Sequence, residues 1–433
     1  MKDGVVRVGV IGGGFVGTSL AQLLSDPSRR EALTDAATAD VELVGVAVRD
    51  LSKTRPGIPK DLLTDDVESL IDSDLDILVE VAGGIEPMKT YIESALKRGV
   101  SVVTGNKALI AQSGPQLAQL AHENQADLFY EGAVGGAIPI LRALRTSLAG
   151  ERITRVMGIV NGTTNFILTK MMNEGSDYAD ALHEAQVLGY AEQADPSADV
   201  EGFDAAAKVQ ILSTLAFGTR LGGDEISREG ITGVRSVDVE VAKRMGYVIK
   251  LIGVAERVGD SGISRRVHPA MVPVAHPLAS VNGAMNAVFV NGVKSGPLMW
   301  LGQGAGGEPT ATAVLGDLLD AARNRVSGRH DVPFSGDHSL HYVPAGELSS
   351  RFYLSVDVWD RPGVLAEVAS VFGRHQVSIQ SMDQSGFSNE ARLAFLTHEA
   401  LSADVEATLA ELSALSSVES VGACIRVIDE EVA

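Results

Sequence analysis

The middle of the chain has four carboxylates close ahead of one lysine. The residues concerned are Glu192, Asp195, Asp199, Asp204 and Lys208. Only the last two are charged between Phe203 and Gly218, and a helix that is apolar on nearly every side is buried. A lysine buried there is costly unless another group compensates for it. Because buried ionisable groups mark chemistry more often than chance does, we interpret the stretch as a site. The alternative is a solvated Asp204–Lys208 pair, worth roughly 0.2–0.5 kcal/mol.

A strand, a glycine loop and a helix are predicted at the start of the chain. Residues 5–11 are β-branched and nearly uncharged, and residues 18–24 follow as a helix. Between them lies Gly-x-Gly-x-x-Gly, whose glycines permit a tight turn, close approach of a pyrophosphate and close helix packing. The free amides at the helix start face the phosphates. The segment predicts dinucleotide binding by Gly12, Gly14, Phe15, Val16 and Gly17.

The second predicted strand, residues 41–48, ends at Arg49. In a dinucleotide fold this end meets the adenosine ribose, where an acid binds the 2′-hydroxyl and an arginine accommodates a 2′-phosphate. Arg49 comes first, with Lys53 and Arg55 close behind, which favours NADP. Asp50 keeps NAD open.

Further parallel strands are predicted at residues 76–81 and 100–104, and the second is followed by Gly105-Asn106-Lys107. Ligands bind beyond the carboxyl ends of such strands. We therefore place Lys107 at the cofactor cleft by topology, with an ordinary surface lysine as the alternative.

Glu131 ends the last strand of this region, and a glycine-dense loop follows over residues 132–138. Backbone carbonyls close together beside a carboxylate could hold a hard monovalent cation. From the residues alone, a tight crossover between domains is favoured. A helix is predicted over 139–149.

A mixed α/β pattern follows. Residues 152–160 predict a strand, and Asn161-Gly162-Thr163-Thr164-Asn165 opens a helix whose donor-rich start suits a polar or carboxylate ligand. Strands are predicted at 267–274 and 287–290. A glycine loop that includes Gly307 and Glu308 leads into a helix from about Thr310 to Arg325, and predicts anion or cofactor contact or simple packing.

The tail predicts a linker and a small module. Residues 326–349 are mixed polar, and His330, His338 and His341 lack a regular ligand spacing, so we interpret them as loop residues. The last ~80 residues have a βαββαβ order, which is ferredoxin-like. The module contains no catalytic constellation, which favours sensing or association.

Composition limits the class of protein. The chain has 433 residues, 45% hydrophobic and 21% charged, which fits a globular protein of about three domains. A net charge of -20 argues against nucleic-acid binding. Cys424 is the only cysteine, which excludes an internal disulfide and a cysteine-based metal site. Without a predicted signal peptide or membrane helix, we expect a cytoplasmic protein.

These motifs together resemble homoserine dehydrogenase over nearly the whole chain. The resemblance rests on a signature from Ala185 to Lys208, on Asn161–Asn165, on Thr104–Leu109 and, for a C-terminal ACT domain, on Asp360–Leu365. The resemblance implies an α/β chain with a Rossmann domain, a mixed α/β catalytic domain and a ferredoxin-like ACT regulatory domain. The implied segments are 1–135 for NAD(P) binding, 136–310 for catalysis and dimerisation, 311–326 for a helix returning toward the nucleotide domain, 327–349 for a linker and 350–433 for the ACT domain.

The resemblance also implies a reaction and residue roles. The reaction is the reversible reduction of aspartate 4-semialdehyde to homoserine with NAD(P)H, in threonine and methionine biosynthesis. Lys208 is the implied proton donor and acceptor, Lys107 a cleft lysine near cofactor and substrate, and Glu192 the partner of the substrate amino group. Further implied substrate contacts are Asp199, Asp204, Asn161 and Thr163. Further implied cofactor contacts are Arg49, Thr104, Gly189, Gly307 and Glu308. Glu131 and the carbonyls of Val134, Gly136 and Ile138 match a sodium site, which revises the crossover interpretation.

Two alternatives remain at this level. One is another Rossmann enzyme acting on an amino-acid semialdehyde, and the other is a non-catalytic amino-acid sensor. We expect threonine to be the effector of the ACT domain and the chain to form a homodimer or homotetramer. The cofactor phosphate preference, the effector and the sodium requirement stay open.

Overall fold

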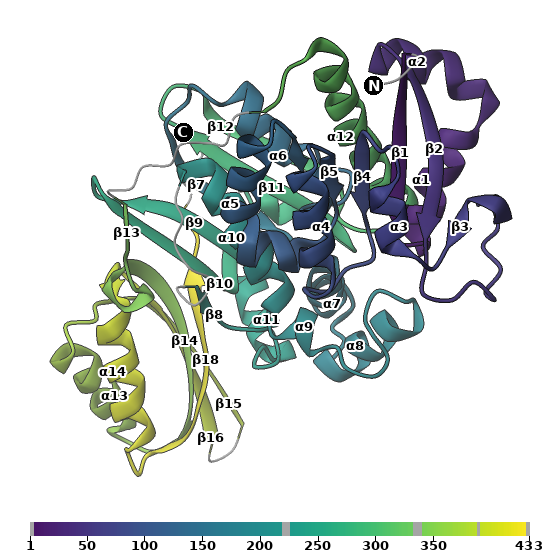
Figure 1. Cartoon of the computed structure of the whole chain (residues 1–433). Coiled ribbons are helices and arrows are strands. Elements are labelled where there is room, and N and C mark those ends of the chain that lie inside the picture. Colours follow the sequence, from purple (N-terminus) through teal and green to yellow (C-terminus); the bar gives the residue numbers. More distant parts are fainter. Residues whose placement is uncertain (1–3, 219–225, 332–339, 388–389, 430–433) are drawn as a thin grey trace. The chain divides into compact units, whose positions relative to one another are not determined.

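The computed structural model describes residues 4–218, 226–331, 340–387 and 390–429. The chain divides into two compact units, each built from separated segments (Figure 1). Unit 1 contains residues 1–151, 210–223 and 300–338, and unit 2 contains residues 152–209, 224–299 and 339–433. His338 and part of the predicted linker lie outside the described residues. No helix in the described ranges is both long and apolar enough to cross a membrane.

Unit 1 is built on a parallel sheet whose order confirms the Rossmann prediction. The strands run in the order β3-β2-β1-β4-β5-β6, with every neighbouring pair parallel. The strand order reverses between β1 and β4, where doubly wound sheets bind dinucleotides. The strands are β1 (Val5–Ile11), β2 (Asp40–Ala47), β3 (Leu63–Thr64), β4 (Ile77–Glu80), β5 (Ser101–Thr104) and β6 (Leu128–Phe129).

Helices pack against this sheet in two groups. One group is α1 (Phe15–Ser25), α2 (Arg30–Ala37) and α12 (Gly307–Ser327), and the other is α3 (Val67–Asp72), α4 (Met88–Lys97) and α5 (Lys107–Glu123). The alternating side chains of Val6, Val8 and Val10 share one core with Leu20 of α1 and Leu318 of α12. A late segment of the chain therefore completes the core of the nucleotide-binding unit. Its helix begins at Gly307, earlier than predicted.

The segment after β6 is irregular. A 3-10 turn covers Glu131–Ala133, a short α-helix, α6, covers Ile140–Arg142, and π-helical turns continue over Ala143–Ser147. The helix predicted over 139–149 is present, but its geometry changes midway. Turns of this π type are frequent near functional sites.

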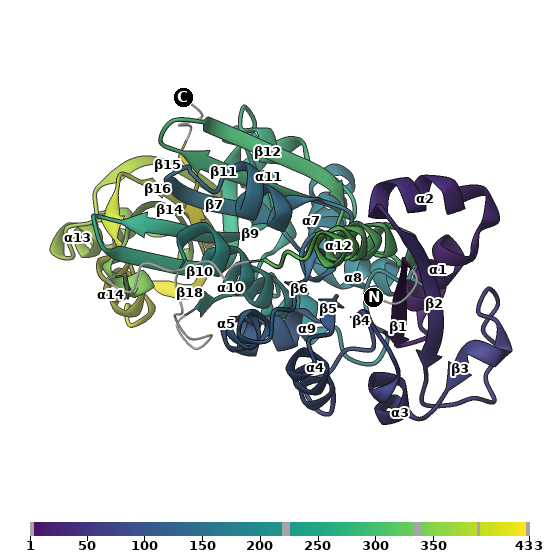
Figure 2. The ribbon, with the colours of Figure 1, turned by 45° about the horizontal axis from the view of Figure 1, so that its top comes forward.

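Unit 2 contains a long mixed sheet, in the order β12-β11-β7-β9-β10-β18-β14-β16-β15. Its first strands are β7 (Ile153–Ile159), β9 (Tyr247–Val258), β10 (Gly262–Pro273), β11 (Met285–Gly292) and β12 (Gly296–Gln303), the last of which is assigned to unit 1 from Trp300 onward. Figure 2 shows β11 and β12 side by side. The sequence prediction included β7, β10 and β11 but did not include β9 or β12. The helices are α7 (Gly162–Glu174), α8 (Tyr178–Val187), α9 (Ser197–Val200), α11 (Ser236–Arg244) and the first turns of α10 (Phe203–Phe217), which is assigned to unit 1 from Gln210 onward.

The tail confirms the predicted βαββαβ module. Its elements are β14 (Ser349–Trp359), α13 (Val364–Arg374), β15 (Ile379–Phe387), β16 (Glu390–Thr397), α14 (Ser402–Ser413) and β18 (Val418–Val427). Both helices lie on one face of its four strands (Figure 1). The end of β18 pairs in parallel with β10, so this module and the middle strands of unit 2 share one sheet.

Buried polar contacts join the tail module to α11. The Asp238 carboxylate is fully buried and accepts hydrogen bonds from the Tyr353 hydroxyl at 3.1 Å and the Ser355 hydroxyl at 3.1 Å. Burial raises the pKa of Tyr353. Arg235, just before α11, lies 3.4 Å from Asp357 on β14. Because the buried Asp238 carboxylate needs these donors, it favours a single position of the tail module against α11.

Candidate active site

The Asp204–Lys208 pair lies inside unit 2, on the first turns of α10. The spacing of four residues puts both side chains on one face of the helix. Lys208 Nζ donates to Asp204 Oδ2 at 2.7 Å and to the carbonyl of Val160 at 2.6 Å. Each side chain belongs to a residue only 8% exposed. The pair is therefore buried, and the solvated alternative does not apply.

Asn161 links this pair to the loop ahead of α10. Its side-chain oxygen caps α7 by accepting from the Thr164 amide at 2.9 Å. Its side-chain nitrogen donates to Asp199 Oδ1 at 2.7 Å and to Asp204 Oδ2 at 3.0 Å. One asparagine thus fixes two carboxylates and a helix start.

Thr163, the second residue of α7, completes the cluster. Its hydroxyl lies 2.5 Å from the Tyr190 carbonyl and 3.2 Å from Asp199 Oδ2. The end of β7, the start of α7, the loop around Tyr190 and the start of α10 therefore meet at one polar cluster. We call it the lysine cluster: Asn161, Thr163, Asp199, Asp204 and Lys208.

The lysine cluster is suited to proton transfer at an oxygen. A lysine ammonium has three N–H donors, and within the described residues two of them are used, by Asp204 and Val160. The third can donate to an oxygen of a ligand. Because the other two bonds fix the ammonium, this donor has a defined position before a ligand arrives.

The structure does not bring every predicted acid to the cluster. Glu192 is exposed, and no hydrogen bond joins its side chain to the lysine cluster in the described part of the chain. Asp195 is also exposed and accepts from the Ser197 amide at 3.0 Å. Gly189 precedes them with φ +77°, a backbone conformation that favours glycine. Of the four acids ahead of Lys208, only Asp199 and Asp204 belong to the cluster.

The glycine loop of unit 1 has the shape that a pyrophosphate needs. A Cβ on Gly17 would lie 1.9 Å from the Gly12 carbonyl, so only glycine permits this packing of α1 on the loop. Gly12 has φ +112°. Gly14 faces open space, and Phe15 beside it is 89% exposed. Gly307, at the start of α12, packs against Phe15. Glu308 follows it and is exposed. The cradle fits a dinucleotide phosphate group.

The end of β2 is basic. Arg49 is exposed there. Arg55 folds back, with Nε 3.3 Å from the Gly13 carbonyl and Nη1 2.8 Å from the Asp50 carbonyl. The Asp50 carboxylate accepts from the Ser52 hydroxyl at 2.6 Å and its amide at 2.9 Å, and these bonds lower the pKa of Asp50.

Lys107 is the first residue of α5 in unit 1 and is half-buried. Thr104, at the end of β5, is buried and hydrogen-bonded to Glu80. Glu80 was not among the predicted site residues. The available signal was a carboxylate ending an otherwise apolar strand.

Glu131 is buried under α6. Its two carboxylate oxygens accept from the amides of Leu141 at 2.8 Å and Arg142 at 2.6 Å, and its own amide donates to Asp317 at 2.6 Å. Burial raises the pKa of Glu131 to about 7 and that of Asp317 to about 6. In the loop that follows, Gly135 and Gly136 have φ +76° and +57°, and Val134 and Ile138 are buried.

A second buried lysine was also missed. Lys250 on β9 donates to the Asn165 side chain at 3.0 Å and to the Val281 carbonyl at 2.6 Å, and burial lowers the pKa of Lys250 to about 8. These bonds hold the loop after β10 against α7. The signal was a single lysine in an apolar strand.

A Rossmann unit with a fitting phosphate loop, a second unit with a buried lysine cluster and a ferredoxin-like tail define a nicotinamide-dependent oxidoreductase with a C-terminal module. Family models match in the same order: "Homoserine dehydrogenase, NAD binding domain" over residues 12–131, "Homoserine dehydrogenase" over 139–319 and "ACT domain" over 352–417. The chain belongs to the homoserine dehydrogenase family.

Relatives agree over nearly the full length. The homoserine dehydrogenase of Corynebacterium glutamicum is 47% identical over 97% of this chain and 95% of its own, and that of Mycobacterium tuberculosis is 48% identical over 97% of both. The crystal structure of the Thiobacillus denitrificans homoserine dehydrogenase has a TM-score of 0.93 at 38% identity, covering 98% of both chains. A hyperthermophilic archaeal homoserine dehydrogenase solved with NADPH has a TM-score of 0.62 at 29% identity, covering 73% of this chain and 97% of that one.

Proposed function

We propose that the chain reversibly reduces L-aspartate 4-semialdehyde to L-homoserine, with Lys208 as the proton donor and acceptor on the substrate oxygen. The observation that carries this proposal is the buried ammonium of Lys208, held by Asp204 and Val160 with one donor remaining. A positioned acid stabilises the alkoxide that forms at the carbonyl oxygen.

The remaining groups of the lysine cluster position Lys208 and the substrate. Asp204 holds the Lys208 side chain in place, and Asn161 bonds both Asp204 and Asp199. Asp199 and Thr163 form the polar wall beside the lysine. Glu192 stands apart on its exposed loop, and we assign its carboxylate to the substrate ammonium group. The bound nicotinamide supplies or accepts the hydride.

We expect Lys208→Met to reduce kcat by about 10²–10⁴-fold, the usual contribution of a general acid or base. The dissociation constant for NADPH should stay within about twofold, because the phosphate loop lies in unit 1. Steady-state homoserine oxidation and NADPH fluorescence titration measure the two quantities. The control is Lys243→Met, which removes an exposed lysine from α11.

Near wild-type turnover in Lys208→Met would exclude Lys208 as the acid. If the unaltered chain oxidised no homoserine but reduced another semialdehyde, the substrate assignment would be wrong. If it turned over no substrate yet bound an amino acid, a sensor would be favoured.

We propose that NADP is the preferred cofactor. The 2′-phosphate would meet Arg49, with Lys53 and Arg55 nearby, at the end of β2. The support is that Arg55 folds onto the glycine loop while the Asp50 carboxylate is engaged by Ser52, away from a ribose role.

Arg49→Ala should therefore raise the KM for NADPH by about tenfold, the loss expected for one charge-assisted hydrogen bond. The KM for NADH should change by less than about twofold. Lys60→Ala, which removes another exposed cation in the same region, is the matched control. Equal losses for both cofactors would contradict the 2′-phosphate assignment.

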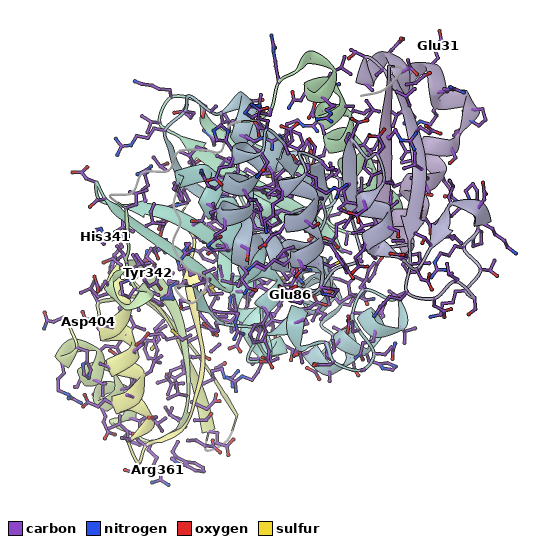
Figure 3. The ribbon with its side chains drawn as sticks, in the orientation of Figure 1. Glu31, Glu86, His341, Tyr342, Arg361 and Asp404 are labelled. Carbon is purple, nitrogen blue, oxygen red and sulfur yellow. The ribbon has the colours of Figure 1, made fainter. Side chains whose placement is uncertain are left out.

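We propose that the tail module binds threonine in a cavity at the start of α13. The cavity has a volume of about 360 Å³ and lies between the loop after β14 and strands β15 and β16. Asp360 and Arg361 line it and carry the two charges that an amino-acid zwitterion needs, and Gln384 offers an amide for the hydroxyl. Figure 3 shows Arg361 on this loop, at the end of the module.

Asp360→Asn should raise the threonine concentration that halves turnover by about tenfold or more, because a charged hydrogen bond to the ammonium is lost. Turnover without threonine should be unchanged. Glu399→Gln, an exposed acid elsewhere in the module, should leave threonine inhibition intact. If threonine has no effect on the unaltered chain, a role in assembly is favoured instead.

We propose that sodium binds beside Glu131 through the carbonyls of Val134, Gly136 and Ile138. The donors are all oxygen, which suits a hard cation. The Glu131 carboxylate is buried there, and a cation would offset its charge. Asp317, which accepts from the Glu131 amide, is already paired with Arg142 at 3.2 Å. Within the described residues, no cluster of three His, Cys, Asp or Glu side chains is suited to a metal, so the carbonyls would supply most ligands.

Sodium chloride should raise the thermal midpoint of the unaltered chain above that in choline chloride at equal ionic strength, because a ligand that binds only the folded state stabilises it. Glu131→Gln should remove the difference, whereas Glu123→Gln, an exposed acid on α5, should retain it. The same midpoint in both salts would refute the site.

A further inference from the structure

Glu80 is a fully buried carboxylate at the last position of β4. Its Oε1 accepts from the amides of Ala82 at 2.9 Å and Gly83 at 2.8 Å. Its Oε2 accepts from the Thr104 hydroxyl at 2.6 Å. The first two bonds wind the loop after β4 around the carboxylate, and the third reaches the end of β5. A single side chain therefore joins two segments about 24 residues apart.

The hydrogen bonds continue from Thr104 to the start of α5. The Thr104 oxygen accepts from the Asn106 amide at 3.0 Å. The Asn106 side chain donates to the Gly84 carbonyl at 2.6 Å and caps α5 by accepting from Leu109 at 3.2 Å. The loop after β4 and the turn after β5 are thus joined twice. Lys107, the first residue of α5, directly follows Asn106, the last residue of this network.

The sheet order tells which part of a dinucleotide these two loops meet. The adenosine ribose meets the end of β2, and the pyrophosphate meets the glycine loop after β1. The nicotinamide half then extends to the other side of β1, over the carboxyl ends of β4 and β5. Those are the two strand ends that Glu80 joins.

We propose that Glu80 is a positioning residue for the nicotinamide half of the cofactor. Its carboxylate fixes the loop after β4 relative to the turn after β5, and through Thr104 and Asn106 it fixes the start of α5 at Lys107. Glu80 does so from below the loops, since it is buried beneath them. The inference uses the family's nicotinamide cofactor and does not depend on the roles proposed for Lys208.

The carboxylate form is what this position requires. Three donors converge on Glu80, and a carboxylate has acceptor sites for all three. A glutamine of the same size keeps one oxygen for the Ala82 and Gly83 amides, but its NH₂ group cannot accept the Thr104 hydroxyl proton. Glu80→Gln therefore removes the charge-assisted bond from Thr104, which is stronger than a bond between neutral groups, and weakens the link between the two loops.

Asp76 provides a matched control on the same strand. It immediately precedes β4, is also buried, and accepts from Arg7 at 3.1 Å and Arg325 at 2.9 Å. It therefore lies at the amino end of the strand, while Glu80 lies at the carboxyl end. Asp76→Asn disturbs a buried carboxylate of unit 1 without touching the loops that the cofactor meets.

The test compares two probes on the apo chain: NADPH, and adenosine diphosphate, which represents only the adenosine half. Glu80→Gln should weaken NADPH about tenfold or more and leave adenosine diphosphate within about twofold. Asp76→Asn should lower the thermal midpoint but keep both affinities within about twofold. Fluorescence titration and calorimetry measure the affinities without any substrate, so the outcome is independent of whether homoserine is turned over.

Three results would overturn the inference. One is unchanged NADPH affinity in Glu80→Gln, and another is an equal loss for NADPH and adenosine diphosphate. The third is the same NADPH loss in Asp76→Asn, which would mean general destabilisation. If Glu80→Gln does not fold, Glu80→Asp, which keeps the charge but shortens the reach to Thr104, replaces it under the same criteria.

Discussion

The bond between the Lys208 ammonium and the Asp204 carboxylate places two opposite charges inside unit 2, on a helix that is otherwise uncharged. Taking charges out of water is expensive, and removing one partner of such a pair typically costs about 3–5 kcal/mol. The surrounding structure adds further hydrogen bonds to the pair: Val160 supplies a carbonyl to Lys208, and Asn161 supplies an amide to Asp204. The end of β7 and the start of α10 are therefore held in one arrangement. Asp199 holds the loop ahead of α10 in the same arrangement.

The same device recurs in both units. Asp204, Glu80 and Asp238 are buried carboxylates, and each receives donors from segments distant in the sequence. In each case the carboxylate fixes the relation between a regular element and a loop or a second element. Apolar packing alone tolerates small displacements of one element relative to another. A displacement that leaves a buried charge without its hydrogen bonds is much more costly. These carboxylates thus fix the positions of elements at the places where a ligand or a module must be oriented.

Local patterns predicted much of this fold and some of the site. The glycine loop, the parallel strands and the βαββαβ tail each have a short-range signature, and the spacing of Asp204 and Lys208 predicts their contact. Contacts between residues far apart in the sequence were harder to predict. β9 was missed because Lys250 and Glu256 interrupt its apolar pattern, and their partners, Asn165 on α7 and Arg266 on β10, belong to other elements. Nothing local distinguishes Asp199, which joins the lysine cluster, from Glu192, which does not; the difference arises from where Asn161 lies in three dimensions.

The separated segments of each unit have a consequence for the nascent chain. The core around Val8 and Leu20 is completed by Val314 and Leu318 of α12, and the sheet that contains β7 is extended by β18 at the far end of the chain. Synthesis proceeds at ~5–20 residues per second, so the stretch between the first and last segments of unit 1 takes on the order of 10 s to be made. During that interval the apolar side of α1 is uncovered on the ribosome. Neither unit can finish folding as its first residues emerge: unit 1 needs its segment up to residue 338, and unit 2 needs the tail, which is made later still.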